Sequence, residues 1–177
     1  IEELISKKID LLINLSASPF SKNKISQRKM LAEKAAERLN CPIIYVNQVG
    51  GNDELIFDGS SFVINKKAED VLSLKSFQEE FILWDSKNTQ KNKVQLKRDP
   101  QEEMFKALVL GVRDYVNKCG FNGSLIGLSG GIDSALVAII AAAALGAKNL
   151  TSVLMPSPWS SKSSVEDALA LTKRLDS

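Results

Sequence analysis

The sequence contains no histidine, and this absence removes several kinds of site at once. Without histidine the chain can form neither a His-based catalytic triad nor a His-containing zinc site. Its two cysteines, Cys41 and Cys119, lie far apart in the sequence and fit no metal-ligand spacing. We therefore interpret both cysteines as small residues of the core.

Long apolar runs are also absent. No segment approaches the roughly 18 apolar residues of a membrane-spanning helix, and no signal peptide is visible, so we expect a cytoplasmic location and no membrane partner. With 44% hydrophobic residues, 25% charged residues and a formal net charge of +2, the composition is that of an ordinary globular protein and demands no nucleic acid. Because the chain begins at Ile1, inside a helical apolar pattern and without a methionine, we interpret it as a piece of a longer protein.

The segment at residues 125–134 organises the rest of the chain. A short apolar run breaks on Gly130 and Gly131 and opens directly into an alanine-rich helix. The free N–H groups at the start of such a helix, its dipole and the hydroxyls of Ser129 and Ser134 suit an anion such as pyrophosphate. We therefore interpret the segment as a phosphate-binding loop between a strand and a helix.

A carboxylate also stands within this loop. Asp133 would repel a phosphate unless a cation lay between them, so we interpret it as a Mg²⁺ ligand that bridges to phosphate oxygens. The loop is not a Walker A loop, because no lysine occurs between Lys118 and Lys148. The alternative is an ordinary strand-to-helix turn with serine and aspartate as helix caps. A cap needs one polar side chain, whereas this loop supplies three beside its paired glycines.

The first half alternates between helix and strand patterns. Helices are predicted at residues 1–8 and 26–39 and buried strands at residues 9–15 and 42–47, so a parallel pair with a right-handed crossover is expected. The apolar stripe of the second helix is predicted at Met30, Leu31, Ala35 and Leu39. A turn at residues 50–54 then leads to the short strands of an antiparallel meander, expected at residues 55–57, 61–64, 71–74 and 81–84.

Residues 86–98 lose the apolar signal and carry spread lysines among Asn, Gln and Thr, which predicts a polar linker at a domain boundary. A nucleic-acid patch is the alternative, but no aromatic residue lies among these basic residues. Asp99 as cap and Pro100 at the first helical position then start a helix that ends at Lys118 and Gly120. Its buried stripe is predicted at Met104, Leu108, Val112 and Tyr115.

The last part continues the alternation. After the loop we predict a helix at residues 132–145, a strand at residues 151–155 and a helix that a capping box of Ser163 and Glu166 starts. This β-α-β-α order predicts a doubly wound parallel sheet, whose ligands lie at the carboxyl ends of the strands. Residues 155–161 are expected at that same edge, beside the phosphate-binding loop.

Several stretches resemble known families. Residues 129–134, Ser-Gly-Gly-Ile-Asp-Ser, resemble the SGGxDS motif of the N-type ATP pyrophosphatases, which split ATP between its α and β phosphates. That motif alone leaves several amidotransferases and thiolation enzymes open. Residues 14–20 and 45–59 resemble the latter part of the nitrilase-like glutaminase domain of glutamine-dependent NAD⁺ synthetases. Residues 155–157 resemble the Met-Pro-Ser stretch of the same synthetases, which is placed to touch the adenine and ribose of ATP.

The resemblance implies an α/β fold class and a domain order. The chain is expected to hold the end of a nitrilase-like α/β sandwich at residues 1–85, a polar linker at residues 86–98 and the start of a doubly wound parallel-sheet ATP pyrophosphatase domain at residues 99–177. Both signatures on one polypeptide are far more specific than either alone.

The resemblance also implies site residues. The family's glutaminase uses a Cys nucleophile, a Glu and a Lys, all upstream of the first strand, so this chain holds no catalytic residue of that domain, and neither Cys41 nor Cys119 matches. Ser18 is expected to help hold glutamine, and Lys24 to lie near its carboxylate. Without the resemblance, a turn hydroxyl and a solvated charge would be the favoured interpretations. ATP binding is expected at Gly127, Leu128, Ser129, Gly130, Gly131, Ile132, Asp133, Ser134 and Met155, with Mg²⁺ on Asp133.

The implied activity is that of a carbon–nitrogen ligase. It amidates nicotinic acid adenine dinucleotide to NAD⁺ with ATP, through an adenylated intermediate and with ammonia from glutamine, and the enzyme is expected to be a homo-oligomer. Two alternatives stay open: another SGGxDS amidotransferase of the GMP or asparagine synthetase type, and a nucleotide-binding fragment without turnover. The chain alone is expected to be inactive, because its synthetase portion has too few strands to bury a core of typical size.

Overall fold

The computed structural model describes residues 1–87, 99–156 and 161–177. The chain divides into two compact units, the first with residues 1–50 and 55–104 and the second with residues 51–54 and 105–177. Most of the expected linker, residues 88–98, lies outside the described residues, so the expected domain boundaries stay a prediction. Among the described residues, no helix is both long and apolar enough to cross a bilayer.

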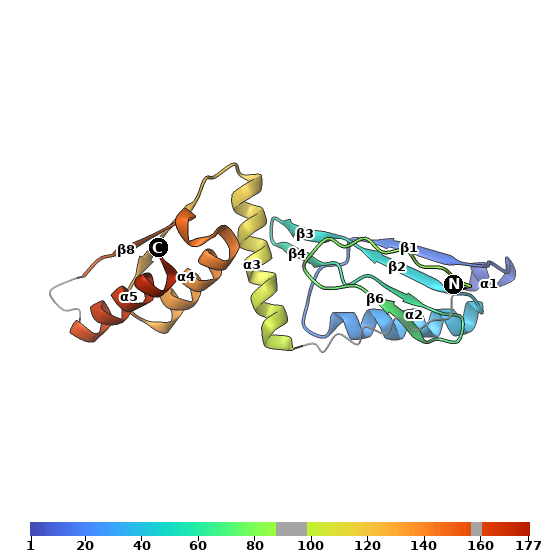
Figure 1. The fold of residues 1–177 in the computed structure, drawn as a ribbon. Helices are drawn as coiled ribbons and strands as arrows, with labels where there is room; N and C mark the ends of the chain where they lie inside the picture. The colour runs from blue at the N-terminus through green and yellow to red at the C-terminus, as the bar shows by residue number, and fades with distance from the viewer. Residues whose placement is uncertain (88–98, 157–160) are drawn as a thin grey trace. The chain divides into compact units, whose positions relative to one another are not determined.

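The first unit begins with the expected parallel strand pair (Figure 1). Its elements in order are α1 (Glu2–Ser6), β1 (Leu12–Ser16), α2 (Lys24–Leu39) and β2 (Ile43–Asn47). β1 and β2 run parallel, with Leu12 opposite Ile43 and Ser16 opposite Asn47. The predicted strand, helix and strand with parallel pairing are thus confirmed.

The antiparallel part of the first unit differs in detail from the expected meander. β5 (Phe62–Ile64) pairs antiparallel with β2, and β6 (Asp70–Ser73) pairs antiparallel with β5, which gives the order β1-β2-β5-β6. β3 (Val49–Asn52) and β4 (Leu55–Asp58) form a separate two-stranded sheet.

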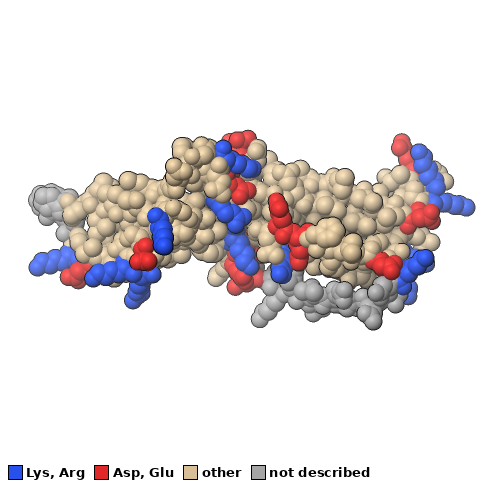
Figure 2. Space-filling view, turned by 45° about the horizontal axis from the view of Figure 1, so that its top comes forward, with Lys and Arg blue, Asp and Glu red and all other residues tan. Residues whose placement is uncertain are grey.

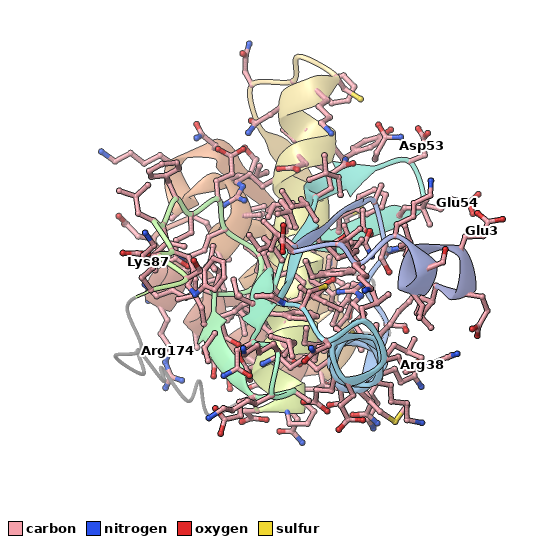
Figure 3. All side chains as sticks on the ribbon, turned by 90° about the vertical axis from the view of Figure 1, so that its right-hand side faces the viewer. Glu3, Arg38, Asp53, Glu54, Lys87 and Arg174 are labelled. Carbon is pink, nitrogen blue, oxygen red and sulfur yellow. The ribbon has the colours of Figure 1, made fainter. Side chains whose placement is uncertain are left out.

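Two local predictions in this region are wrong. Gly50, Gly51 and Asn52 are part of a strand, and the turn itself contains Asp53 and Glu54, which Figure 3 labels. The two glycines led to the prediction of a turn because glycine is common in turns. Glycine also tolerates the extended backbone of a strand. Residues 81–84 lie outside any strand, and two of their apolar side chains are largely exposed, Phe81 at 87% and Leu83 at 85%.

The core of the first unit lies between α2 and one face of the sheet. The helix contributes Ile25, Ala32, Ala35 and Ala36, and the strands contribute Ile43, Tyr45, Phe62 and Ile64. The rings of Tyr45 and Phe62 stack with their centroids 4.9 Å apart. The predicted stripe is correct for Ala35 and Leu39 but wrong for Met30 and Leu31, which are 45% and 62% exposed. The buried stripe of α2 includes a charged residue, Arg28. The positions of the apolar residues alone therefore indicate the wrong face of the helix.

The second unit has the expected β-α-β-α order. Its elements are α3 (Pro100–Lys118), most of which belongs here, β7 (Ser124–Leu128), α4 (Ile132–Leu145), a 3₁₀ turn at Ala147–Asn149, β8 (Leu150–Leu154) and α5 (Lys162–Leu175). β7 and β8 are parallel, with Ser124 opposite Leu150 and Leu128 opposite Leu154. A small core joins Leu128, Ala138 and Ala168, so α4 and α5 pack on the strands through small side chains.

Two predictions about the helices of this unit need correction. The buried residues of α3 are Ala107, Leu110 and Val116, whereas Met104, Leu108 and Tyr115 are exposed. The N-cap of α5 is Ser161, whose Oγ accepts a hydrogen bond of 3.1 Å from the N–H of Ser164, and not Ser163. The start of α3 is as predicted, since Asp99 Oδ1 accepts a 2.9 Å hydrogen bond from the N–H of Gln101.

Basic and acidic side chains neighbour one another on the face drawn in Figure 2 and do not gather by sign. This mixture agrees with the small formal net charge of +2.

The two cysteines differ in their surroundings, which makes the prediction that both are core residues correct for Cys41 and wrong for Cys119. Cys41 is 1% exposed, whereas Cys119 is exposed. Burial raises the pKa of the Cys41 thiol; a hydrogen bond with the backbone of Leu12 opposes this, and the Asp10 carboxylate adds to it.

In the folded protein at pH 8 we expect a thiol reagent such as iodoacetamide to modify Cys119 and spare Cys41. The thiolate is the reactive form, and a raised pKa leaves less of it at a given pH. Peptide mass spectrometry after brief labelling measures both sites, and labelling in urea provides the control in which both react. Equal labelling of the two cysteines in the folded protein would contradict the burial of Cys41.

Candidate functional site

The loop between β7 and α4 leaves the first turn of α4 without a side-chain cap. The N-cap of α4 is Gly131, in extended backbone with φ −84° and ψ 160°, and no side-chain hydrogen bond caps the helix. The first N–H groups of a helix have no acceptor within the helix. The alternative in which serine or aspartate caps this helix is therefore not the arrangement in the structure, and the N–H groups are left for a ligand or solvent.

Two serine hydroxyls shape the loop from within. The Oγ atoms of Ser129 and Ser134 lie 3.1 Å apart, and Ser134 Oγ accepts a 3.3 Å hydrogen bond from the N–H of Ser129. Ser129 Oγ accepts from the N–H of Gly131 at 3.2 Å, and Ser134 Oγ donates to the Gly131 carbonyl at 3.0 Å. These contacts curl the backbone around the start of α4.

The paired glycines have different roles. Gly130 has φ +82°, and a Cβ atom built on it would lie 2.1 Å from the carbonyl oxygen of Ser164 in α5. Gly131 has a negative φ, and its Cβ would lie 3.4 Å from Ser129 Oγ, an ordinary contact. Of the two glycines, Gly130 alone has the positive φ that favours glycine.

The carboxyl ends of β7 and β8 bring two predicted site residues together. A Cβ atom on Gly127 would lie 2.9 Å from the terminal methyl of Met155, whose side chain is 72% exposed. Leu128 is 5% exposed and packs in the core, so at this position only the backbone faces the loop. Ile132 is 81% exposed. The predicted ATP-binding residues thus share one sheet edge, and their binding role stays a prediction.

Asp133 lies in the first turn of α4, and its side chain is exposed. Within the described residues, no group of three or more Asp, Glu, Cys or His side chains is placed to hold a metal ion. A lone carboxylate fits Mg²⁺, which is commonly bound by one or two carboxylates together with substrate phosphates and water.

In the first unit, the loop after β1 is held by side chains of its own unit. The N–H of Ser18 donates to Asn47 Oδ1 at 2.8 Å, and Asn47 Nδ2 donates to the Ser18 carbonyl at 3.1 Å. Ser18 Oγ accepts a 3.1 Å hydrogen bond from Arg28 Nε. Lys24, the second residue expected near glutamine, is the first residue of α2 and is half-buried.

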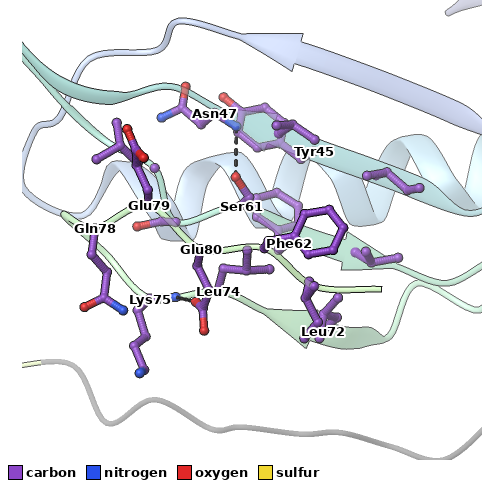
Figure 4. Close-up of a pocket in the computed structure, with 18 of the residues that line it drawn as sticks. Tyr45, Asn47, Ser61, Phe62, Leu72, Leu74, Lys75, Gln78, Glu79 and Glu80 are labelled. Atoms are coloured by element: carbon purple, nitrogen blue, oxygen red, sulfur yellow. Dashed lines mark hydrogen bonds between the residues drawn. The ribbon is translucent and has the colours of Figure 1, made fainter. Parts of the chain in front are cut away.

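A cavity of about 440 Å³ lies beside this network, between the sheet and residues 74–84 of the first unit (Figure 4). Its lining is mixed, with Phe62 and Leu72 beside Lys75 and the acidic Glu79 and Glu80. The N–H of Asn47 donates to Ser61 Oγ at 3.0 Å on the cavity wall, so the residue that holds Ser18 also borders the cavity.

Comparisons with known proteins bear on both units. Residues 104–177 match the NAD synthase family. The chain is 49% identical, over 98% of its length, to the glutamine-dependent NAD(+) synthetase of Synechocystis sp. and 40% identical, over 99%, to that of Acinetobacter baylyi. The family resemblance predicted from the sequence is confirmed. The chain spans about a third of these synthetases, 32% and 33% of their lengths.

Solved structures of such synthetases agree with the fold. A glutamine-dependent NAD⁺ synthetase from Acinetobacter baumannii, in complex with adenosine diphosphate, superimposes with a TM-score of 0.86 at 36% identity over 99% of this chain and 34% of its own. A synthetase from Cytophaga hutchinsonii shares the fold, with a TM-score of 0.81 at 22% identity over 97% of this chain and 35% of its own. The predicted α/β fold class is thus confirmed.

Three buried polar residues beside the Ser18 loop were not predicted from the sequence. They are Arg28 at 7%, Asn47 at 5% and Asp58 at 3% exposure. Arg28 could have been found, because it stands one helical turn before Ala32 on the buried stripe of α2. A charge on an apolar stripe indicates a buried partner, since an unpaired buried charge is costly.

The different roles of the two glycines can be separated by substitution. We expect Gly130→Ala to lower the free energy of unfolding of the second unit by about 1–3 kcal/mol, because it adds a clash with Ser164 to a strained φ. The matched control Gly131→Ala should change it by less than about 1 kcal/mol, because the backbone there suits alanine. Urea unfolding measures both, and equal effects would show that Gly130 is not the constrained position.

Proposed function

We propose that this chain is part of an enzyme that amidates nicotinic acid adenine dinucleotide to NAD⁺ with ATP, using ammonia from glutamine. The observation that carries the proposal is that similarity to glutamine-dependent NAD(+) synthetases extends across both units, over 98% and 99% of the chain. An amidotransferase of the GMP or asparagine synthetase type would share the SGGxDS loop but carry a differently built glutaminase. The extent of the match therefore favours the NAD⁺ synthetase.

In the proposed reaction the carboxylate of the substrate attacks the α-phosphate of ATP, and pyrophosphate leaves. Ammonia then forms the C–N bond of the amide and displaces AMP. The loop at residues 129–134 would hold the leaving pyrophosphate against the uncapped start of α4, while Met155 would lie near the adenosine. Positioning and stabilisation of developing charge are what such a site contributes. The ADP bound to the Acinetobacter baumannii synthetase supports an adenine nucleotide as the ligand.

Mg²⁺ is part of the proposal. When bound, it would neutralise phosphate charge and orient the pyrophosphate as a leaving group. Asp133 would hold it, because the carboxylate lies in the turn from which the free N–H groups of α4 emerge.

The first unit is proposed to contribute to the glutamine site. Ser18 and Lys24 would bind glutamine, while the nucleophile and its two partners would come from elsewhere in the enzyme. Because glutamine and ATP would bind at separate sites, ammonia would pass from one to the other. A cytoplasmic location and a homo-oligomeric state remain expectations from the sequence, as does the inactivity of this chain alone.

The first test concerns Asp133, in a full-length synthetase that carries this segment. We expect Asp133→Asn to lower NAD⁺ formation by about a hundredfold or more with either glutamine or ammonia as nitrogen donor, because Mg²⁺ loses its carboxylate. Glutamine hydrolysis should persist. The matched control is Asp167→Asn, which removes an exposed carboxylate from α5. If glutaminase activity fell in parallel, the variant would be misfolded, and if synthesis were unchanged, the metal role would be wrong.

The second test concerns Ser18. Ser18→Ala should raise the KM for glutamine about two- to tenfold, the equivalent of a lost hydrogen bond of about 0.5–1.5 kcal/mol, and leave synthesis from free ammonia unchanged. The matched control is Ser26→Ala on the exposed surface of α2. A similar drop in the ammonia-driven reaction would indicate that Ser18 supports the fold and not glutamine.

A further inference from the structure

We propose that Arg28 is a positioning residue for the glutamine site: its guanidinium fixes the loop at residues 18–20 and leaves Ser18 as a hydrogen-bond donor to the substrate. The inference deepens the proposed function and rests on the assignment of Ser18 to glutamine. No part of it depends on the ATP loop.

Arg28 is a buried charge with a buried partner. Its Nη1 atom donates to both carboxylate oxygens of Asp58, at 2.8 and 3.0 Å, and the two residues are 7% and 3% exposed. A buried charge pair adds little net stability compared with an apolar pair, but removal of one partner is strongly destabilising. A role beyond stability must therefore come from what else the guanidinium binds.

The remaining donors of Arg28 all reach one short loop. Nη2 donates to the carbonyl oxygens of Ser18, at 2.7 Å, and Pro19, at 3.0 Å, and Nε donates to Ser18 Oγ at 3.1 Å. These directions follow from the rigid planar fork of a guanidinium, which lysine cannot reproduce. Asp58 thus orients the fork, and the fork sets the position of Ser18.

Other contacts hold the same loop from different sides. Asn47 binds both the N–H and the carbonyl of Ser18, and the N–H of Phe20 donates to the Ile56 carbonyl at 2.6 Å. The ring of Phe20 packs edge-on against Phe77, with centroids 5.1 Å apart. A loop fixed by so many contacts presents Ser18 in a set direction before any ligand binds, which lowers the entropic cost of binding.

The contact with Arg28 also determines what Ser18 can do. Because Ser18 Oγ accepts from Nε, its own O–H is the group left to act outward, as a donor. Donation from a cationic group polarises the hydroxyl and strengthens it as a donor. A ligand oxygen, as in a carboxylate or an amide carbonyl, matches this arrangement.

The test is Arg28→Lys in a full-length synthetase that carries this segment. Lysine keeps the charge near Asp58 but loses the fork, so we expect the KM for glutamine to rise about two- to tenfold, with kcat and ammonia-driven synthesis unchanged. The matched control is Arg38→Lys on the same helix. The ion pair of Arg38 with Glu2 is exposed, unlike the buried pair of Arg28 with Asp58, and Arg38 lies at the periphery in Figure 3. Arg38→Lys should leave the KM unchanged.

A double variant distinguishes positioning from a general structural role. If Arg28 acts through Ser18, the KM of the Ser18→Ala, Arg28→Lys double variant should match that of the larger single variant, because effects through one shared contact are not additive. Multiplied effects would overturn the proposal, as would an equal loss in ammonia-driven synthesis. If Arg28→Lys yields no folded protein, Asp58→Glu takes its place in these comparisons with Ser18→Ala, because it keeps the charge pair but shifts the carboxylate by one methylene.

The failure of this inference differs from failure of the proposed function. A raised KM in Ser18→Ala with an unchanged KM in Arg28→Lys would overturn the positioning role and keep Ser18 in the glutamine site. An unchanged KM in both variants would remove Ser18 from that site, and the inference with it.

Discussion

Parallel strand pairing is the constraint on which both candidate sites depend. In each unit, two parallel strands joined by a helix must end at the same sheet edge, so the loop after the first strand opens where the second strand also ends. Ser18 follows β1 beside Asn47 at the end of β2, and Gly127 near the end of β7 lies against Met155 after β8. The sites are thus consequences of the same topology in two separate sheets.

The backbone groups of the loop around Ser18 and of the loop around Ser129 find their hydrogen-bond partners in different ways. Around Ser18, the carbonyl groups of Ser18 and Pro19 accept hydrogen bonds from a guanidinium whose charge Asp58 balances. Around Ser129 the loop bonds to itself through two hydroxyls and leaves the start of α4 uncapped. The first arrangement suits a small ligand that needs direction, and the second suits an anion that needs many N–H groups.

Local chemistry was predictable from the sequence, whereas burial was predictable in part. The helix at Ile132–Leu145 and the parallel pairing followed from glycine positions and apolar runs, which are encoded locally. The stripes of α2 and α3 were misplaced because apolar side chains such as Leu31 and Leu108 face outward, and the pattern alone cannot tell which apolar face of a helix is buried. The position of Arg28 on the buried stripe was visible in the sequence, but its partner was not, because Asp58 lies far along the chain and no local rule connects the two residues.

The close approach of Gly130 to the carbonyl of Ser164 brings the start of α5 directly against the loop at residues 129–134. A displacement of α5 would therefore displace the loop as well, because the backbone of the loop lies directly against the backbone of the helix. Insertions or bends at the start of α5 would tilt the loop without altering any of its residues. The backbone position of α5 is therefore coupled to a glycine in a loop that precedes it by an entire strand and helix.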